Sequence, residues 1–238
     1  MKTIILAGGL GTRLRRAVPD RPKPMALVAG RPFLDYVILR LIQAGLCDIT
    51  LSIGYRGNTI RDHFGSDWNG ANISYAEENE PLGTGGAVAY AAGNAGAEPL
   101  MIVNGDTFLD LDFAALRLWR QSRGPTSSFA MVLRRVEDVS RYGAVSCDSE
   151  IVTGFAEKGL AGPGLINAGV SIIDQGVFSR FGLSGRFSLE TDLIQPNLAA
   201  LRPTAYITDA FFIDIGVEED FRRAQTEIPR QFDRAPQA

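Results

Sequence analysis

The first fourteen residues constrain this chain more than any other segment, because an apolar run leads directly into a glycine-rich loop. The run covers residues 3–7, and the loop reads Gly8-Gly9-Leu10-Gly11-Thr12-Arg13-Leu14. A short apolar run predicts a buried strand, and glycines without a Cβ allow backbone N–H groups to approach a phosphate closely. A helix beginning near Thr12 would add its positive N-terminal end. This segment therefore predicts the strand, phosphate-binding loop and helix that open an α/β sheet.

Two cationic side chains accompany the loop. Arg13 lies within it, and Lys23 comes nine residues after Leu14, between two prolines that restrict its backbone. The site would combine the backbone N–H groups of a glycine-rich loop with two positive side chains. This combination indicates a polyanionic ligand. We predict a nucleoside triphosphate site; a glycine-rich turn that binds no ligand is the alternative that the loop alone leaves open.

The residues that the loop lacks exclude two common nucleotide sites. A Walker A loop ends in Gly-Lys-Ser/Thr, whereas Thr12 and Arg13 follow Gly11 here. A dinucleotide fingerprint, G-x-G-x-x-G, would need a third glycine where Leu14 stands. The loop therefore predicts neither a P-loop nor a Rossmann dehydrogenase.

Apolar runs bounded by turn residues alternate with helical patterns, which is the rhythm of parallel βα units. In the first half we expect strands at residues 3–7, 48–53, 73–76 and 100–104, and helices at 32–43, 58–64, 84–92 and 113–123. After residue 125 we expect strands at 128–134, 143–147, 153–156, 168–173, 204–207 and 211–215, and helices at 176–181 and 219–227. The predicted fold class is α/β: a Rossmann-like, mostly parallel but mixed sheet in three layers, with helices on both faces.

Composition narrows the classes of ligand and environment. The chain has 238 residues, 24 of them basic and 27 acidic, and a net charge of −3, so it lacks the electrostatic footprint of a nucleic-acid-binding protein. The first apolar run is too short for a signal peptide, and no transmembrane-length run follows, so we expect a cytoplasmic protein with no membrane partner. Cys47 and Cys147 lack the spacing of a zinc site or disulfide framework. His63 is the only histidine, and we expect a surface or packing role for it.

Two aspartates stand out by their sequence context. Asp106 follows the apolar run 100–103, which places a carboxylate at the carboxyl end of a strand, where open α/β sheets bind ligands. Taken alone, an aspartate in such a turn is more often a turn or cap residue than a metal ligand. Asp214 lies in Phe211-Phe212-Ile213-Asp214-Ile215-Gly216, where a buried carboxylate needs a counter-ion, either an arginine or a metal ion.

The stretch from Leu6 to Leu14, together with Pro22-Lys23-Pro24-Met25, resembles the signature of the sugar-1-phosphate nucleotidylyltransferases. The resemblance covers residues 1 to about 225. It is greatest to the guanylyltransferases that activate D-glycero-α-D-manno-heptose 1-phosphate, through residues 80–87, 103–108 and 211–216. It implies the nucleotide-diphospho-sugar transferase fold and Mg²⁺-dependent transfer of a nucleotidyl group from an NTP, GTP first, to this sugar 1-phosphate, with release of pyrophosphate.

The resemblance also implies roles for residues around the nucleotide. Asp106 and Asp214 match the pair that holds Mg²⁺, with Asp110 and Asp112 as second choices. Arg13, Lys23 and Asp106 are the expected catalytic residues, with Arg13 facing the β- and γ-phosphates and Lys23 the α-phosphate. The attacking sugar phosphate is already ionised at neutral pH, so no general base is needed. The expected nucleotide-binding residues are Leu6, Ala7, Gly8, Gly9, Gly11, Thr12, Arg13, Lys23, Glu78, Pro81, Gly83 and Thr84.

The base and the sugar phosphate have their own expected contacts. Glu78 occupies the position that hydrogen-bonds the base in relatives, and a carboxylate complements the paired N1–H and N2–H₂ donors of guanine; an exposed acidic loop is the alternative. Glycines at residues 83–86 are expected to allow close approach of a flat base. Lys158 resembles the lysine that holds the phosphate of the sugar, although Gly159 stands where the family has proline. The expected sugar phosphate contacts are Asn104, Gly143, Glu157, Lys158 and Asn167, followed by Glu190 and Asp192.

The resemblance implies one domain over residues 1–238, with a nucleotide-binding part at about 1–125, a sugar-binding part at about 126–228 and a frayed tail at 229–238. The resemblance also implies that the product serves cell-surface polysaccharide or glycoprotein assembly. The first alternative is uridylyl transfer to N-acetylmuramate 1-phosphate or a hexose 1-phosphate. The second is a non-catalytic nucleotide-sugar sensor, which the presence of Arg13, Lys23 and both aspartates disfavours. No surface stripe in the sequence predicts an oligomeric state.

Overall fold

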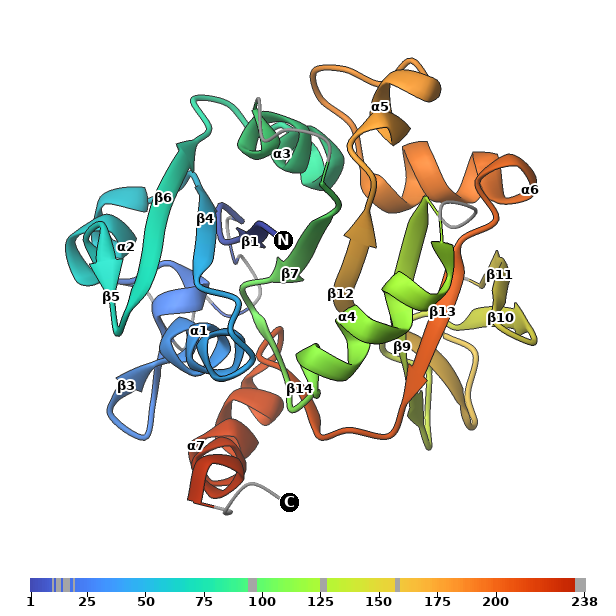
Figure 1. The fold of residues 1–238 in the computed structure, drawn as a ribbon. Helices are drawn as coiled ribbons and strands as arrows, with labels where there is room; N and C mark the ends of the chain where they lie inside the picture. The colour runs from blue at the N-terminus through green and yellow to red at the C-terminus, as the bar shows by residue number, and fades with distance from the viewer. Residues whose placement is uncertain are drawn as a thin grey trace.

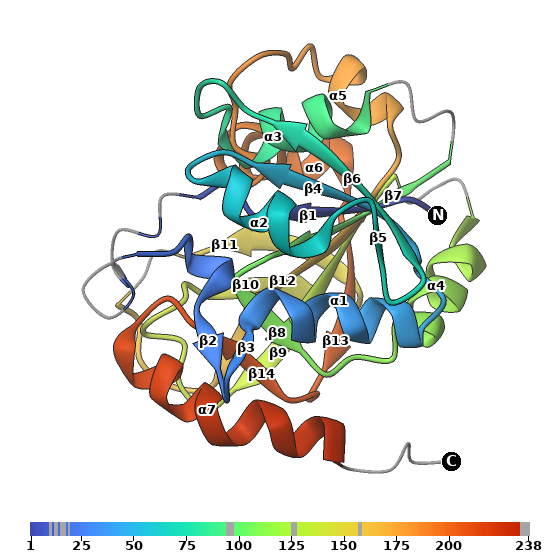
Figure 2. The same cartoon turned by 90° about the vertical axis from the view of Figure 1, so that its left-hand side faces the viewer.

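The computed structural model describes residues 1–9, 11, 14, 18, 20–93, 98–124, 128–156 and 159–233. Within these residues, a mixed sheet of ten strands runs through both halves of the chain in the order β10-β11-β13-β9-β12-β7-β1-β4-β6-β5. Helices cover both faces of this sheet, as Figures 1 and 2 show. The predicted α/β fold class is therefore confirmed.

The parallel centre of the sheet is built from apolar runs of the first half. β7 (Leu100–Asn104), β1 (Thr3–Leu6), β4 (Asp48–Ile53) and β6 (Ala71–Glu77) lie side by side in parallel, and β5 (Asp67–Trp68) pairs antiparallel with β6 at the edge. Most residues of β1, β4 and β7 are buried, because helices pack on both faces. Since these strands run in one direction, their carboxyl ends meet at the same end of the sheet.

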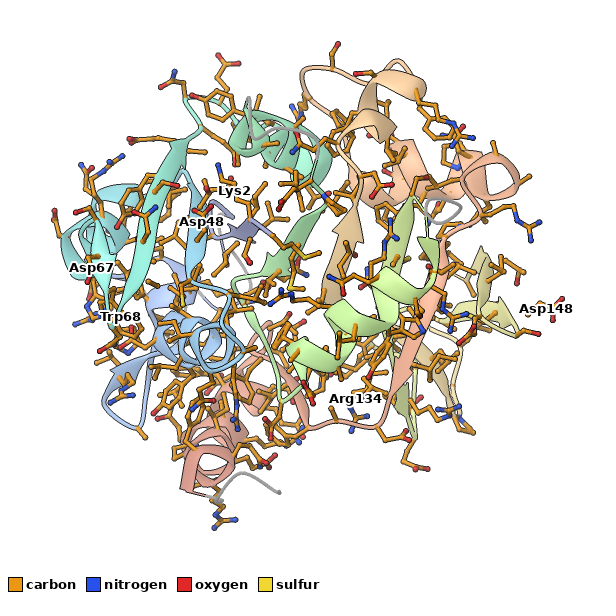
Figure 3. All side chains as sticks on the ribbon, in the orientation of Figure 1. Lys2, Asp48, Asp67, Trp68, Arg134 and Asp148 are labelled. Carbon is orange, nitrogen blue, oxygen red and sulfur yellow. The ribbon has the colours of Figure 1, made fainter. Side chains whose placement is uncertain are left out.

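Two apolar clusters fill the layers between the sheet and the helices, one cluster on each face. Adjacent strand residues alternate between them, as Ile4 and Ile5 of β1 do. The first cluster includes residues of α1 (Phe33–Gln43), α2 (Gly57–Phe64), α4 (Phe113–Ser122) and α7 (Glu218–Asp233). The second includes residues of α3 (Gly83–Ala92), α5 (Gly176–Arg180) and α6 (Leu198–Leu201). Figure 2 shows α3, α5 and α6 on one side of the sheet and α1 and α7 on the other, and Figure 3 shows side chains filling both layers.

The second half extends the sheet with strands of mixed direction. β12 (Gly164–Ile173) pairs antiparallel with both β7 and β9 (Phe129–Val136), and β13 (Thr204–Thr208) pairs parallel with β9. β11 (Ile151–Phe155) and β10 (Val145–Asp148) complete the sheet. The register of β12 with β9 shifts between Asn167 and Ser171. Such irregularities bend a strand and re-aim its side chains, and this one lies next to the site described below.

Several short elements were not predicted from the sequence. They are η1 (Lys23–Met25), β2 (Leu27–Val28), β3 (Arg31–Pro32), β5, β8 (Thr107–Leu109), η3 (Leu189–Ile194), η4 (Gln195–Asn197) and α6. The segment 189–201 changes from π-helix to 3₁₀-helix to α-helix, so it carries no single hydrophobic period that a sequence pattern could reveal. β14 (Phe212–Asp214) was expected, and it pairs with β8 outside the main sheet.

The expected frayed tail from residue 229 is wrong for residues 229–233, because α7 continues to Asp233 with Pro229 inside it. Ile228 is fully buried, and the ring of Phe232 lies 5.4 Å from that of Tyr36 and 5.8 Å from that of Phe108. This apolar docking against α1 and β8 outweighs the low helix propensity of proline. Residues 234–238 lie outside the described part of the chain. Across the described residues, no helix combines the length and apolar character that crossing a membrane requires.

Candidate active site

A cavity of about 710 Å³ opens where the parallel strands end. Each of the four strand ends contributes to its wall, with Ala7 after β1, Ser52 in β4, Glu78 after β6 and Asn104 in β7. Open α/β sheets bind ligands at this position. The predicted nucleotide-binding residues that line the cavity are Leu6, Ala7, Gly8, Gly9, Gly11, Lys23, Glu78, Pro81, Gly83 and Thr84. Thr12 and Arg13 lie outside the described residues.

Lys23 bridges the two aspartates that the sequence singled out. Its Nζ lies 2.6 Å from Asp106 Oδ2 and 3.3 Å from Asp214 Oδ1. The pairing of β8 with β14 places Asp214 opposite Thr107, the residue after Asp106, and the Ile215 N–H donates to the carbonyl of Asp106 at 3.1 Å. Antiparallel pairing of two short strands therefore brings the carboxylates together.

The electrostatics of this cluster favour a bound cation. Burial raises the pKa of the Asp214 carboxyl, and the charge of Asp106 raises it further, whereas Lys23 and the Gly216 N–H lower it. The two carboxylates converge on one point, since the same ammonium contacts both of them. A point flanked by two carboxylates suits a hard, oxygen-seeking cation.

The donor set also indicates how such a cation would be held. Among the described residues, no cluster of three or more His, Cys, Asp or Glu side chains is present that could form a complete cage. Proteins usually bind Mg²⁺ through one or two carboxylates, and substrate phosphates supply further ligands. Asp106 and Asp214 therefore fit Mg²⁺ as partial ligands. Their side chains are 38% and 31% exposed, and Asp106 lines the cavity.

The glycine-rich loop packs against both functional groups of the cavity. Gly11 has a φ of +57°, and a Cβ there would lie 2.9 Å from the Cβ of Lys23. A Cβ on Gly8 would lie 3.2 Å from Glu78 Oε1. A side chain at either position would crowd the lysine or the carboxylate, so glycine is required for the close approach.

Glu78 is held in a defined orientation. Its Oε1 accepts a hydrogen bond from Ser52 Oγ at 2.8 Å, and its Oε2 accepts one from the Leu82 N–H at 3.0 Å. The sequence left open whether Glu78 belongs to an exposed acidic loop. In the structure it lines the cavity and is half-buried, with both carboxylate oxygens anchored.

The glycines that follow Glu78 also pack closely against another segment of the protein. A Cβ on Gly83 would lie 2.6 Å from the carbonyl oxygen of Phe187, and one on Gly85 would lie 2.2 Å from its ring. The N–H groups of Gly85 and Gly86 donate to that same carbonyl at 2.9 and 3.1 Å. The close approach is therefore made by a segment of the protein, which also caps the first turn of α3.

The expected sugar contacts divide into two groups. Asn104 lines the cavity and packs over Gly169, whose φ of +75° belongs to the irregular part of β12. Asn167 accepts a hydrogen bond from the Gly169 N–H at 3.0 Å, and Gly143 has a φ of +84°; neither residue belongs to the cavity lining. Glu157 and Lys158 lie outside the described residues.

The remaining acidic candidates have partners elsewhere. Asp110 pairs with Arg40 at 2.7 Å, and Asp112 caps α4 by accepting from the Ala115 N–H at 2.8 Å. Asp192 accepts from the Ser188 N–H at 2.6 Å, and Glu190 accepts from Gln195 at 3.5 Å. Asp112 and Asp192 therefore cap local structure, and Asp110 joins the end of β8 to α1.

His63 takes a packing role away from the cavity. Its Nε2 lies 2.7 Å from Asp35 Oδ1, and its ring stacks edge-on against Phe64. This geometry joins α2 to α1, as the sequence led us to expect.

The cavity wall also contains eight residues that were not among the predicted site residues: Leu14, Pro24, Ser52, Gly54, Tyr55, Asn79, Ala87 and Gly216. Ser52 lies at the end of a predicted strand, and Tyr55 and Asn79 follow predicted strands directly. Their positions at or just after the ends of predicted strands could have identified them as site residues, because those ends converge on the ligand side of the sheet.

Known proteins resemble this chain over nearly its whole length. A family model described as nucleotidyl transferase matches residues 2–231. The D-glycero-alpha-D-manno-heptose 1-phosphate guanylyltransferase of Aneurinibacillus thermoaerophilus is 38% identical over 228 residues, which cover 96% of this chain and 98% of that protein. The protein of the same name from Campylobacter jejuni subsp. jejuni is 38% identical over 222 residues, covering 93% and 97%.

Solved structures share the fold. The crystal structure of HddC from Yersinia pseudotuberculosis complexed with GMP-PN has a TM-score of 0.82 and 36% identity, covering 94% of this chain and 97% of that one. A putative glucose-1-phosphate thymidylyltransferase from Bacillus anthracis has a TM-score of 0.84 at 22% identity and covers 98% and 99% of the two chains. This second likeness concerns the fold alone.

Proposed function

Because this chain belongs to the nucleotidyl transferase family, we propose that it transfers a guanylyl group from GTP to D-glycero-α-D-manno-heptose 1-phosphate, giving the GDP-sugar and pyrophosphate. The names of the two relatives that are 38% identical support this choice of substrates. The structural observation that carries the chemistry is the convergence of Asp106 and Asp214 on Lys23, since Lys23 and Asp106 line a cavity large enough for a nucleotide.

The proposed reaction is one in-line displacement at phosphorus. A phosphate oxygen of the sugar 1-phosphate attacks the α-phosphorus of GTP, a new P–O bond forms, and the bond from the α-phosphorus to the β-phosphate oxygen breaks. The bond's electrons leave with pyrophosphate. The nucleophile is already an anion at neutral pH, so the protein has to position and neutralise charge rather than remove a proton.

This chain's residues would divide that work. Lys23 supplies an ammonium to the α-phosphate, and the loop around Gly8, Gly9 and Gly11 supplies backbone N–H groups to the phosphates. Asp106 and Asp214 would hold Mg²⁺, which neutralises phosphate charge and orients the triphosphate. In the proposal, Arg13 contacts the β- and γ-phosphates and Lys158 contacts the phosphate of the sugar.

A substrate panel tests the proposal directly. The purified protein is incubated with Mg²⁺, with each common NTP in turn, and with heptose, N-acetylmuramate, mannose or glucose 1-phosphate, and pyrophosphate release is measured. We expect release with GTP and the heptose phosphate, and its loss when EDTA removes the metal. Preferred release with UTP and another sugar phosphate would replace the proposal with uridylyl transfer.

A second arm of the panel addresses the sensor alternative. If no pair of substrates releases pyrophosphate, binding of GTP and of the GDP-sugar is measured by calorimetry. Binding without turnover would favour a nucleotide-sugar sensor and overturn the proposed activity.

A further inference from the structure

Ser52 connects two parts of the cavity wall. It is completely buried at the carboxyl end of β4, and its carbonyl accepts a hydrogen bond from the Ala7 N–H at 2.8 Å, just before the glycine-rich loop. Its hydroxyl donates to Glu78 Oε1 at 2.8 Å. One residue therefore holds the start of the phosphate loop through its backbone and the Glu78 carboxylate through its side chain.

The register of the sheet explains why this hydroxyl reaches Glu78. Ser52 is paired with Ala76 of β6, which has no polar side chain to offer. Two residues earlier on the same face of β4, Thr50 is paired with Ser74, and their hydroxyls hydrogen-bond to each other at 2.8 Å. The Ser52 hydroxyl instead donates to Glu78, the first residue after β6. Both pairs use a hydroxyl of the same face of β4, but only Ser52 and Glu78 line the cavity.

The anchored Glu78 carboxylate can still accept hydrogen bonds from a ligand. Each of its oxygens has two acceptor positions, and Ser52 and the Leu82 N–H occupy one position on each oxygen. Among the described residues nothing else occupies these positions, so both oxygens retain a lone pair for a ligand. Adjacent acceptors of this kind match a pair of adjacent donors, which guanine presents as N1–H and N2–H₂, whereas hypoxanthine presents only N1–H.

We propose that Ser52 is the positioning residue for recognition of the guanine 2-amino group, acting by fixing the rotamer of Glu78. The inference rests on the proposed function and names the base contact within that same site. Without the hydroxyl, a glutamate with three rotatable bonds loses one of its two anchors. Its oxygens then no longer meet both donors at once. A base lacking the 2-amino group therefore loses less affinity relative to guanine.

The test compares GTP with ITP, which differ only in the 2-amino group. Dissociation constants are measured by calorimetry with Mg²⁺ and no sugar phosphate, so the result does not depend on the identity of the sugar. A hydrogen bond to a charged acceptor changes affinity by about tenfold or more, so we expect the wild-type protein to bind GTP at least about tenfold more tightly than ITP. Ser52→Ala should reduce this preference to about threefold or less, mainly because the variant binds GTP more weakly.

Thr50→Val is the matched control, because it removes the hydroxyl of the neighbouring pair from the same strand face outside the cavity. It should retain the wild-type GTP-to-ITP ratio. Should Ser52→Ala fail to fold, Ser52→Cys, which keeps the side-chain size and supplies a weaker donor, provides the same comparison. A wild-type ratio in the folded Ser52 variant would overturn the proposal.

The outcomes separate this inference from the proposed function. Equal binding of GTP and ITP by the wild-type protein would overturn the base contact while leaving guanylyl transfer intact. Failure to bind GTP, together with turnover of UTP, would remove the proposed function itself and this inference with it.

Discussion

Lys23 Nζ lies 2.6 Å from Asp106 Oδ2 although 83 residues separate the two in sequence. The same ammonium lies 3.3 Å from Asp214 Oδ1 across a separation of 191 residues. The lysine side chain is only 10% exposed, so it is the counter-ion that these two carboxylates have within the described part of the chain. A divalent cation entering between the carboxylates would take over that role.

Replacing Lys23 with glutamine should therefore make the fold more dependent on metal. The carboxylates lose their counter-ion and repel each other, so the melting temperature without Mg²⁺ should fall, and Mg²⁺ should raise it more than in the wild-type protein. Differential scanning fluorimetry with Mg²⁺ or EDTA measures both effects. Lys2→Gln, which removes a lysine outside the cavity lining, is the control. An identical Mg²⁺ response in the Lys23 variant and the wild type would contradict the prediction.

Asp106→Asn should abolish most turnover while leaving the fold intact. The amide keeps the shape of the side chain but removes a charge facing the phosphates, and we expect pyrophosphate release to fall at least about 100-fold. Circular dichroism checks the fold, and Mn²⁺ titration checks metal affinity. Asp112→Asn is matched to it, because asparagine also caps a helix well. Near-normal turnover in Asp106→Asn would remove this residue from the metal site.

Gly85→Ala should destabilise the protein through the segment that packs on α3. The new Cβ would lie 2.2 Å from the ring of the buried Phe187, and overpacking of this kind costs about 1–3 kcal/mol or more. Urea unfolding measures the loss. Gly176→Ala is the control, since nothing lies within 4 Å of its Cβ position. If the clash is the cause, the double variant Gly85→Ala/Phe187→Ala should lose less stability than the two single losses added together.

Asp35 should make the stability of the native state depend on pH. Burial raises the pKa of its carboxyl above the ordinary 3.8, although His63 and Arg31 act in the opposite direction. The native protein then holds a proton that the unfolded chain has released, so this contribution to stability is complete below pH 3.8 and is lost as pH rises through the folded-state pKa.

Asp35→Asn lacks this titration, so the stability of the wild type relative to the variant should fall as pH rises through that window. Urea unfolding at a series of pH values gives the difference. Asp62→Asn, which changes an exposed carboxylate beside His63, should show no comparable trend. A difference between wild type and Asp35→Asn that stays constant with pH would rule out the raised pKa.

Local patterns predicted the central strands well. The runs 48–53 and 100–104 coincide with β4 and β7, because a short apolar run bounded by turn residues leaves few alternatives. The end of the chain was harder to predict. We expected the last helix to end at residue 227, whereas α7 continues through Pro229 to Asp233, where Phe232 docks on Tyr36. Tertiary contacts override local propensity wherever they bury apolar surface.

The candidate site was also only partly predictable. The glycine loop, Lys23 and the two aspartates were selected from their motifs, but the neighbour of Gly85 was not. Its partner, Phe187, comes from a segment about a hundred residues away that carries no motif of its own. Ser52 was missed for a similar reason, since a serine in a strand becomes meaningful only once its neighbour Glu78 is known.

The alternation of strands and helices and the glycine-rich loop are visible in the chain alone, because each depends on residues close together in it. The placement of Lys23 between Asp106 and Asp214, and the anchoring of Glu78 by Ser52, required the folded structure. The pairing of β8 with β14 brings the two aspartates together, and that of β4 with β6 brings Ser52 to Glu78. Such pairing joins residues that are distant in sequence, and it is selected by the burial of the whole sheet rather than by any local pattern.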